Sequence, residues 1–284
     1  MILVTGYRGF VGSHLVKRLD DWVGFDLKDG MDLADLDSVK QFIKKYKPDK
    51  VIHLASESVA KYCDDNPDIA FRNIAQATFN LLEAVKDVER FVYISSSMVY
   101  GDFYKDNNNE ILPAIERQNC RPKGVYGKLK LVCEEMVKTS GLPFVIIRPS
   151  AVYGYGDTNN RVVQLFLERA MKGLPLTLDN GGLHQLDFTY VDDLVEGLVL
   201  ALEEDRAVYE TFNMTYGQGR TIKELANIIK DILPKTKIVD KKADVFRPNR
   251  GTLDCVWAIS ILGYRPKYKL EQGLRRYYEN KIAE

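Results

Sequence analysis

Cysteine and histidine are both scarce in this sequence, with four cysteines and three histidines among 284 residues. The cysteines, at Cys63, Cys120, Cys133 and Cys255, show no C-x-x-C spacing, and no histidine has a second potential ligand close by in the chain. The sequence therefore predicts neither a disulfide framework nor a metal site. The formal net charge is zero, which removes the long-range attraction that nucleic acids exert on basic proteins.

Long hydrophobic runs are also missing. No apolar stretch approaches the ~20 residues that a membrane helix needs. The opening residues, MILVTG, are typical of a short strand rather than of a cleaved leader. We therefore expect a cytoplasmic protein with no nucleic-acid partner and no membrane partner.

Short apolar runs alternate with amphipathic stretches through the first half of the chain. The runs ILVTG, KVIHLAS, RFVYISS and FVIIRP are almost wholly apolar, as strands are when helices cover both faces of a sheet. This alternation predicts an α/β fold with a doubly wound parallel sheet. Beyond Gly154 the pattern loosens, and a later helix is predicted to begin at Thr221, which forms a T-x-x-E capping box with Glu224.

The segment VTGYRGFVGSHL places Gly6, Gly9 and Gly12 directly after the first strand and at the start of a helix. Glycines at such a point permit a tight turn and let the backbone approach a pyrophosphate, which the free N–H groups of the helix can bind. Asp26 ends the next strand, where a carboxylate can bind the hydroxyls of an adenosine ribose and repel a 2′-phosphate. The pattern indicates NAD rather than NADP as cofactor.

Two basic residues complicate the choice of cofactor. Arg8 lies inside the glycine loop and Lys28 lies just after Asp26, and both could attract a 2′-phosphate. For each we favour a solvated base or a pyrophosphate contact, and NADP stays open as the alternative.

Tyr126 and Lys130 stand four residues apart at the predicted start of a helix, so they share one face. A phenol with a reference pKa of ~10 is almost fully protonated at neutral pH, and a nearby ammonium group favours the phenolate that a base requires. The strand RFVYI ends in Ser95, Ser96 and Ser97, at the carboxyl edge where open α/β sheets bind ligands.

A series of motifs resembles one family along nearly the whole chain. The segments TGYRGFVG, HLAS, SSSMVYG, YGKLK, RPSAVYG, DFTYVDDL and FRPNRG occur in the order found in the extended short-chain dehydrogenase/reductase family, in its nucleotide-sugar epimerase group. The resemblance implies a Rossmann-type NAD-binding domain over residues 1–154, completed by about 185–206. A smaller substrate-binding domain would comprise residues 155–184 and 207–284. It also implies a homodimer, and a nucleotide-diphosphate sugar, most readily a UDP-sugar, as substrate.

The resemblance also implies the roles of individual residues. Tyr126 would be the general base, Lys130 would hold the nicotinamide ribose, and Ser96 would bind the sugar hydroxyl and relay its proton. The cofactor would be bound by Gly6, Arg8, Gly9, Phe10, Val11, Gly12, Asp26, Asp32, Leu33, Leu54, Ala55, Ser56, Asn73, Tyr126, Lys130 and Pro149. The substrate would be bound by Lys61, Ser96, Ser97, Tyr126, Arg161 and Arg247.

The two residues after the expected catalytic serine indicate which of the family's reactions this chain catalyses. Relatives that dehydrate nucleotide sugars carry acidic residues there, and a route through deprotonation beside a ketone uses a cysteine, whereas this chain has Ser97 and Met98. The resemblance therefore favours an epimerase that acts at C4 through transient oxidation to a 4-keto sugar. The alternatives are a C4 reductase or dehydrogenase with net turnover of the cofactor, and a non-catalytic nucleotide-binding protein of the same fold.

Two positions depart from the family pattern. Leu186 stands where relatives usually have an arginine, and Ala151 stands where they have an asparagine before VYG. If Leu186 occupies the arginine position, one contact to the diphosphate is missing, and Arg161 or Arg250 would have to supply it.

Overall fold

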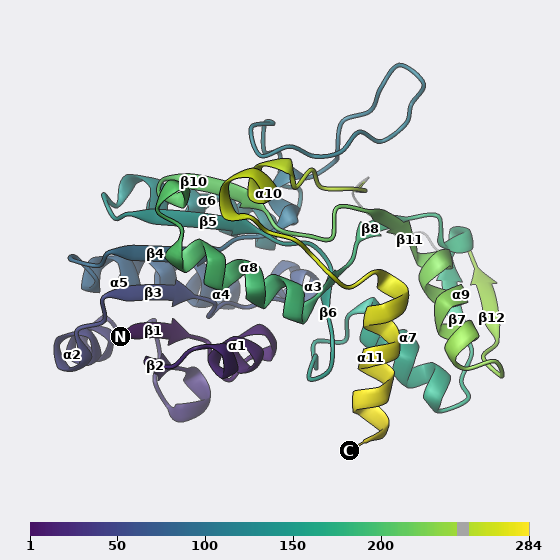
Figure 1. Cartoon of the computed structure of the whole chain (residues 1–284), viewed down its shortest axis with the longest axis horizontal. Coiled ribbons are helices and arrows are strands. Elements are labelled where there is room, and N and C mark those ends of the chain that lie inside the picture. The colour runs from purple at the N-terminus through teal and green to yellow at the C-terminus, as the bar shows by residue number, and fades with distance from the viewer. Residues whose placement is uncertain (243–249, 284) are drawn as a thin grey trace.

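Six parallel strands form the central sheet of the computed structural model, which describes residues 1–242 and 250–283 (Figure 1). Their order is β10-β5-β4-β3-β1-β2, and every neighbouring pair is parallel. This confirms the predicted α/β fold with a parallel sheet. The strands are β1 Ile2–Thr5, β2 Trp22–Phe25, β3 Lys50–His53, β4 Arg90–Ile94, β5 Phe144–Arg148 and β10 Glu210–Asn213.

Helices cover both faces of this sheet because successive side chains of a strand point in opposite directions. Val51 packs into the cluster formed with α2, α5 and α6, whereas its neighbour Ile52 packs into the cluster formed with α1, α8 and α10. The helices are α1 Phe10–Leu15, α2 Leu36–Tyr46, α3 Ala60–Asp65, α4 Pro67–Phe71, α5 Ala77–Ala84, α6 Val125–Thr139, α8 Val191–Glu203 and α10 Val256–Leu262.

A smaller set of elements lies to one side of the sheet, at the right of Figure 1. It has its own apolar cluster, which includes Leu178, Leu225 and Leu274. Helix α9 begins after Thr221, and the predicted capping box with Glu224 is present. The elements are β7 Leu176–Asp179, β8 Gln185–Asp187, β11 Gly219–Thr221, β12 Ile238–Lys241, α7 Val162–Met171, α9 Ile222–Ile232 and α11 Leu270–Ile282, with β6 Val152–Tyr153 and β9 Thr189–Tyr190 at the junction.

The predicted domain division needs one correction. Residues 207–284 were assigned to the smaller domain, but β10 pairs in parallel with β5 at the edge of the central sheet, and α10 packs on β10 and α8. The apolar face of α8 packs against the sheet, so the strand that follows it returns to the same sheet as a further βαβ unit. The remainder of the division stays a prediction.

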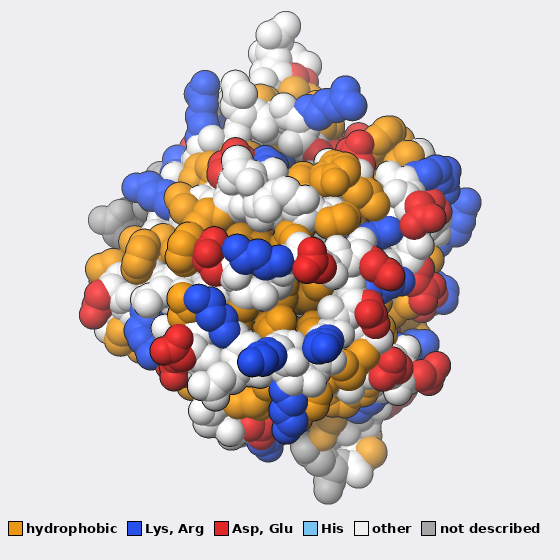
Figure 2. Space-filling model, turned by 90° about the vertical axis from the view of Figure 1, so that its left-hand side faces the viewer, with side chains coloured by type: hydrophobic (Ala, Val, Ile, Leu, Met, Phe, Trp, Pro, Cys, Tyr) orange, Lys and Arg blue, Asp and Glu red, His pale blue; other side chains and the backbone are white. Residues whose placement is uncertain are grey.

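The face at the amino ends of the strands carries basic and acidic side chains interspersed among apolar ones (Figure 2). This mixture agrees with the formal net charge of zero. Within residues 1–242 and 250–283, no helix has both the length and the apolar character that crossing a membrane requires.

Candidate active site

A cavity of about 260 Å³ lies beside the glycine loop, at the carboxyl ends of β1 and β2. We call it the glycine-loop cavity. Several predicted cofactor residues line it, namely Gly6, Gly9, Asp26, Asp32, Leu33, Leu54, Ala55, Ser56 and Asn73. Asn73 lies in a π-helical turn, Arg72–Gln76, between α4 and α5, and such turns occur frequently at functional sites.

The glycines of this loop leave no room for side chains. Gly6 has φ +70°, and a Cβ built on it would lie 2.7 Å from the backbone nitrogen of Ala55. A Cβ on Gly12 would lie 2.3 Å from the carbonyl oxygen of Gly6. The loop therefore exposes bare backbone at the start of α1, as a dinucleotide site requires.

The Asp26 carboxylate is fixed by two backbone N–H groups. Oδ2 accepts from the N–H of Arg8 and Oδ1 from the N–H of Lys28, each at 2.9 Å. Arg8 forms an ion pair with Asp29, and the ammonium group of Lys28 donates to the carbonyl of Arg8 at 3.1 Å. Both bases that could have attracted a 2′-phosphate thus have partners within the protein, and the carboxylate lines the cavity together with Lys28.

A second cavity, of about 430 Å³, opens at the carboxyl ends of β4 and β5. We call it the central cavity. It shares Leu54 and Ser56 with the glycine-loop cavity, so the two adjoin. Its lining brings together the predicted residues Val11, Ser96, Ser97, Tyr126, Lys130, Pro149 and Arg161.

The start of α6 places Tyr126 and Lys130 in this cavity. The helix begins at Val125, so the two residues lie one turn apart. Nζ of Lys130 donates to the carbonyl of Ile94 at 2.8 Å and lies 5.9 Å from the centre of the Tyr126 ring. Ser96 lies two residues after the end of β4, and its Oγ accepts from the N–H of Met98 at 3.1 Å.

The protonation of these groups depends on their burial. Burial raises the pKa of the Tyr126 phenol, while the positive charge of Arg161 and a hydrogen bond with Ser96 act in the opposite direction. Burial also lowers the pKa of Lys130 to about 8. The sequence pattern indicated Lys130 as the cation that favours the phenolate, but Arg161 is the charge that lowers the pKa of this phenol most.

The charged side chains that line the central cavity are all basic in the described part of the chain, although Asp157 pairs with Arg161 at 3.7 Å. Lys130, Arg161 and Arg250 line it, and no described aspartate or glutamate does. A guanidinium nitrogen of Arg250 approaches the sulfur of Met98 at 3.1 Å. The lining therefore suits an anionic ligand.

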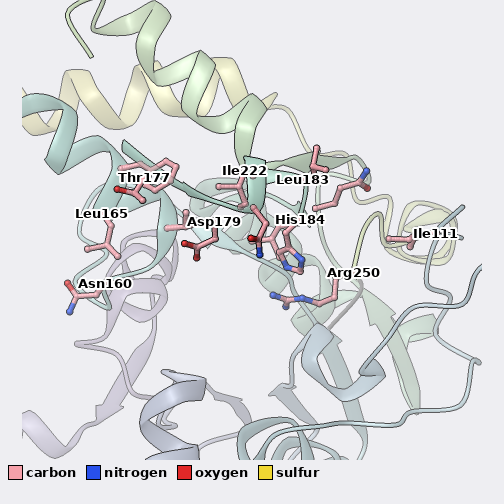
Figure 3. A pocket seen from close by; sticks show the side chains of 15 residues that line it. Ile111, Asn160, Leu165, Thr177, Asp179, Leu183, His184, Ile222 and Arg250 are labelled. Atoms are coloured by element: carbon pink, nitrogen blue, oxygen red, sulfur yellow. The ribbon is translucent and has the colours of Figure 1, made fainter. Parts of the chain in front are cut away.

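A third cavity, of about 660 Å³, continues from the central one and shares Asn160, Val162, Leu186 and Arg250 with it. We call it the outer cavity. Figure 3 shows Asp179, His184 and Arg250 among the side chains that line it. The central cavity, which Tyr126 lines, thus lies between the glycine-loop cavity and the outer cavity.

The model of the NAD dependent epimerase/dehydratase family matches residues 2–215. The chain belongs to this family. As a member it is an enzyme with NAD as cofactor, and the exposed backbone of the glycine loop and the fixed Asp26 carboxylate fit that cofactor.

Known relatives are similar along almost the full length of this epimerase/dehydratase chain. A dTDP-glucose 4,6-dehydratase of Haemophilus influenzae is 28% identical over 97% of this chain and 96% of its own. The solved structure of UDP-glucose 4-epimerase from Thermotoga maritima with UDP-glucose has a TM-score of 0.91 and 26% identity, over 100% of this chain and 99% of that one. The Thermus thermophilus UDP-glucose 4-epimerase in complex with NAD has a TM-score of 0.87 and 27% identity, over 98% and 97% of the two chains.

Some predicted site residues lie outside the cavity linings. Lys61 is 84% exposed on α3 and pairs with Asp65 at 2.9 Å, so the structure does not bring it into the site. Phe10 is buried, with its ring edge-on to His14. Arg8 and Gly12 support the loop without lining a cavity, and Arg247 lies outside the described residues.

The two departures from the family pattern both fall within the site. Leu186 lines the central and outer cavities, and Arg250 lines both as well. Ala151 lines the central cavity with φ +36°, a left-handed conformation that asparagine adopts more readily than alanine. Motif reading missed further lining residues, among them Glu57, Ser58, Asn159 and Asn160. The irregular sequence GYGDTNN and the polar residues after HLAS were the available signals for them.

Proposed function

We propose that this protein is an NAD-dependent nucleotide-sugar epimerase that acts at C4, with a UDP-sugar as substrate. The meeting of Ser96, Tyr126 and Lys130 in the central cavity carries the proposal, because this cavity adjoins both the glycine-loop cavity and the outer cavity. The similar solved structures named as UDP-glucose 4-epimerases support the choice of substrate.

The cofactor would be held by the backbone of Gly6 and Gly9 at its pyrophosphate, by Asp26 at its adenosine ribose and by Lys130 at its nicotinamide ribose. The chemistry that NAD would supply when bound is reversible hydride transfer at C4 of the sugar.

Tyr126 would take the proton of the sugar hydroxyl, with Ser96 as the relay between them. A buried phenol holds its proton tightly, so a base at this position needs nearby positive charge. Burial raises the pKa of Tyr126, the charge of Arg161 opposes this rise, and Lys130 lies within the same cavity. After the sugar turns over, the same phenol would return the proton.

The nucleotide would extend into the outer cavity, with its diphosphate at the boundary between the two cavities. Arg250 lines both cavities and Arg161 lines the central one. These two guanidinium groups can bind the diphosphate in place of the arginine that relatives have at the position of Leu186. Dehydration requires an additional acid and base, and the described lining residues of the central cavity include no carboxylate.

The test begins with the purified protein. Any bound nucleotide is released and identified, and the protein is then incubated with UDP-, dTDP-, GDP- and CDP-sugars without added cofactor. Formation of the C4 stereoisomer with no net reduction of NAD is the expected result. Product that forms only when NADH or NADPH is supplied, and that consumes it stoichiometrically, would establish the reductase instead.

Replacement of Tyr126 by phenylalanine removes the base and should lower turnover by about 10²–10⁴-fold with little loss of NAD binding. Tyr62→Phe is the matched control, since Tyr62 lies on α3 and is exposed. Equal turnover of the two variants would reject Tyr126 as the base.

We further propose that the protein is a cytoplasmic homodimer. Exposed apolar side chains on the neighbouring helices α3 to α6 support a dimer, among them Phe71 and Phe79, which are 55% and 49% exposed. The four free cysteines agree with a reducing compartment. Analytical ultracentrifugation of the wild-type protein and of Phe71→Asp tests the assembly, and a monomeric wild type would reject it.

A further inference from the structure

Ser95, the residue before the proposed relay Ser96, makes a hydrogen bond across to helix α6. Its Oγ donates to Oε1 of Glu134 at 2.5 Å, and both side chains are buried. Its backbone N–H donates to the carbonyl of Ile147 at 2.8 Å, which continues the pairing of β4 with β5. The strand end is therefore joined to β5 by its backbone and to α6 by its side chain.

Glu134 lies on the same face of α6 as the proposed base. It follows Lys130 by four residues and Tyr126 by eight, which is about two turns of helix. A helix of fifteen residues with its inner face packed in the core is rigid over that distance. The position of Glu134 relative to Tyr126 is consequently set by the helix itself.

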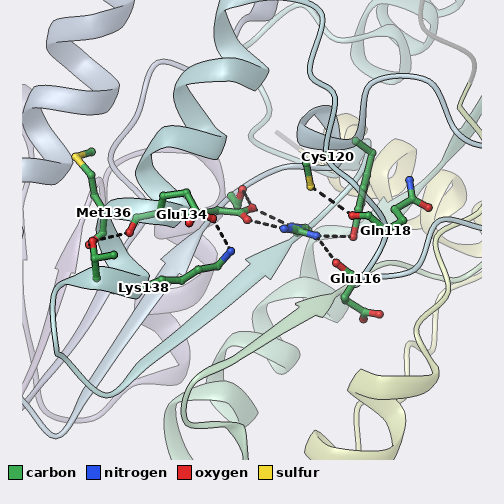
Figure 4. A network of polar contacts seen from close by, with 11 residues as sticks. Glu116, Gln118, Cys120, Glu134, Met136 and Lys138 are labelled. Carbon is green, nitrogen blue, oxygen red and sulfur yellow. Dashed lines mark hydrogen bonds and ion pairs between the residues drawn. The ribbon is translucent and has the colours of Figure 1, made fainter.

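Glu134 is in turn held by Arg148 at the end of β5. Nε donates to Oε1 at 2.9 Å and Nη2 to Oε2 at 2.5 Å, and Nη1 donates to the carbonyl of Glu116 at 3.0 Å (Figure 4). Because the guanidinium fork engages both oxygens, the carboxylate cannot rotate away from Ser95.

We infer that Ser95 and Glu134 are positioning residues, which fix the Ser96 hydroxyl relative to the Tyr126 phenol. Ser96 is joined to Ser95 by one peptide bond, and Tyr126 is joined to Glu134 by two turns of rigid helix. The Ser95–Glu134 hydrogen bond thus connects the two elements that carry the base and the relay.

The chemistry of the pair supports a geometric role. A buried ion pair is often no more stabilising than apolar side chains of similar volume, so stability alone does not account for it. A carboxylate can accept from Ser95 and from both arms of Arg148 at once, which an apolar residue cannot do. Proton transfer depends steeply on the separation of the groups involved, and a misplacement of about 1 Å can lower turnover by about 10²-fold.

The inference rests on the proposed function, and three variants test it. Ser95→Ala removes the hydroxyl and leaves the ion pair between Glu134 and Arg148 intact. Ser95→Thr retains a hydroxyl. Tyr100→Phe is the control on the far side of the network, where the Tyr100 hydroxyl accepts from Arg148 at 3.0 Å and donates to Asn213 at 2.7 Å.

Ser95→Ala should lower kcat by about 10–100-fold, with KM for the sugar nucleotide within about 3-fold of wild type. The acidic limb of its rate profile should move to higher pH, because the hydrogen bond with Ser96 lowers the pKa of Tyr126. Ser95→Thr should recover most of kcat, and Tyr100→Phe should keep it. Wild-type kcat and pH profile in Ser95→Ala, or an equal loss in Tyr100→Phe, would overturn the inference.

Crystal structures of the wild-type protein and Ser95→Ala test the positioning role independently of turnover. A longer separation of the Ser96 and Tyr126 hydroxyls in the variant is expected, and an unchanged separation would overturn the positioning role. An inactive wild type would reject the proposed epimerase alone, whereas an active wild type with an equally active Ser95→Ala would reject the positioning role alone.

Discussion

Replacement of Glu134 by glutamine should destabilise the protein strongly, because it leaves the Arg148 guanidinium without a counter-charge in the interior. The two side chains are 0% and 4% exposed. Burial by itself lowers the pKa of Arg148, but the hydrogen bonds and the negative charge of Glu134, together with nearby Tyr100 and Cys120, raise this pKa overall, so the guanidinium stays charged. Removal of one partner from a buried pair of this kind costs about 3–5 kcal/mol.

The loss can be converted into a melting temperature. A chain of 284 residues has an unfolding entropy of roughly 600 cal/mol/K, at about 2.1 cal/mol/K per residue. The Tm of Glu134→Gln should therefore fall by about 5–8 °C. Differential scanning calorimetry of both proteins at the same saturating NAD concentration measures the difference.

The next residue on the helix offers a matched control. Glu135 pairs with Lys138 at 2.8 Å on the surface, where the side chains are 60% and 35% exposed. Such pairs contribute less than ~1 kcal/mol, so Glu135→Gln should shift Tm by about 2 °C or less. Equal shifts in the two glutamine variants would refute the reasoning, as would a double variant, Glu134→Leu with Arg148→Met, that is less stable than Glu134→Gln alone.

Three further outcomes are expected. Gly6→Ala should weaken NAD binding by roughly tenfold or more, since its Cβ would collide with the backbone, whereas Gly30→Ala, at a similar positive φ with open space around it, should not; calorimetric titration with NAD compares them. Lys130 has a folded-state pKa of about 8 against a usual 10.5. The destabilisation caused by its buried charge is therefore complete below pH 8 and disappears as pH rises towards 10.5. NAD-free Lys130→Met should accordingly be about 3 kcal/mol more stable than wild type at pH 7 and about equal at pH 10.5 in urea unfolding, and a constant difference would contradict this. Asp26→Ala should bind NAD roughly tenfold more weakly and lose the preference for NAD over NADP. An unaltered preference in binding assays would contradict the assignment of Asp26 to the adenosine ribose.

Local patterns in the sequence predicted the main elements well. Apolar runs predicted the parallel strands, and the T-x-x-E pattern predicted the start of α9. The four-residue spacing of Tyr126 and Lys130 placed both side chains in one cavity. These features depend on residues that are close together in the chain, so spacing alone specifies them.

Contacts between distant segments were harder to predict. Strand β10 pairs with β5 in the central sheet, although the surrounding sequence had been assigned to the smaller domain. Arg161, predicted as a substrate contact, also acts on the Tyr126 phenol from a segment 35 positions further along the chain. Nothing in the local pattern specifies the direction of these side chains.

By itself, the sequence determined the α/β class, the glycine loop, the carboxylate after the second strand and the single helical face that carries Tyr126 and Lys130. Each follows from local periodicity and from the conformations that glycine allows. Only the tertiary structure decided which charges surround the phenol, that Arg250 lines the same cavity as Leu186, and that Ser95 reaches Glu134. Those relations depend on packing between segments that are remote in the chain, where burial and distance set the energies.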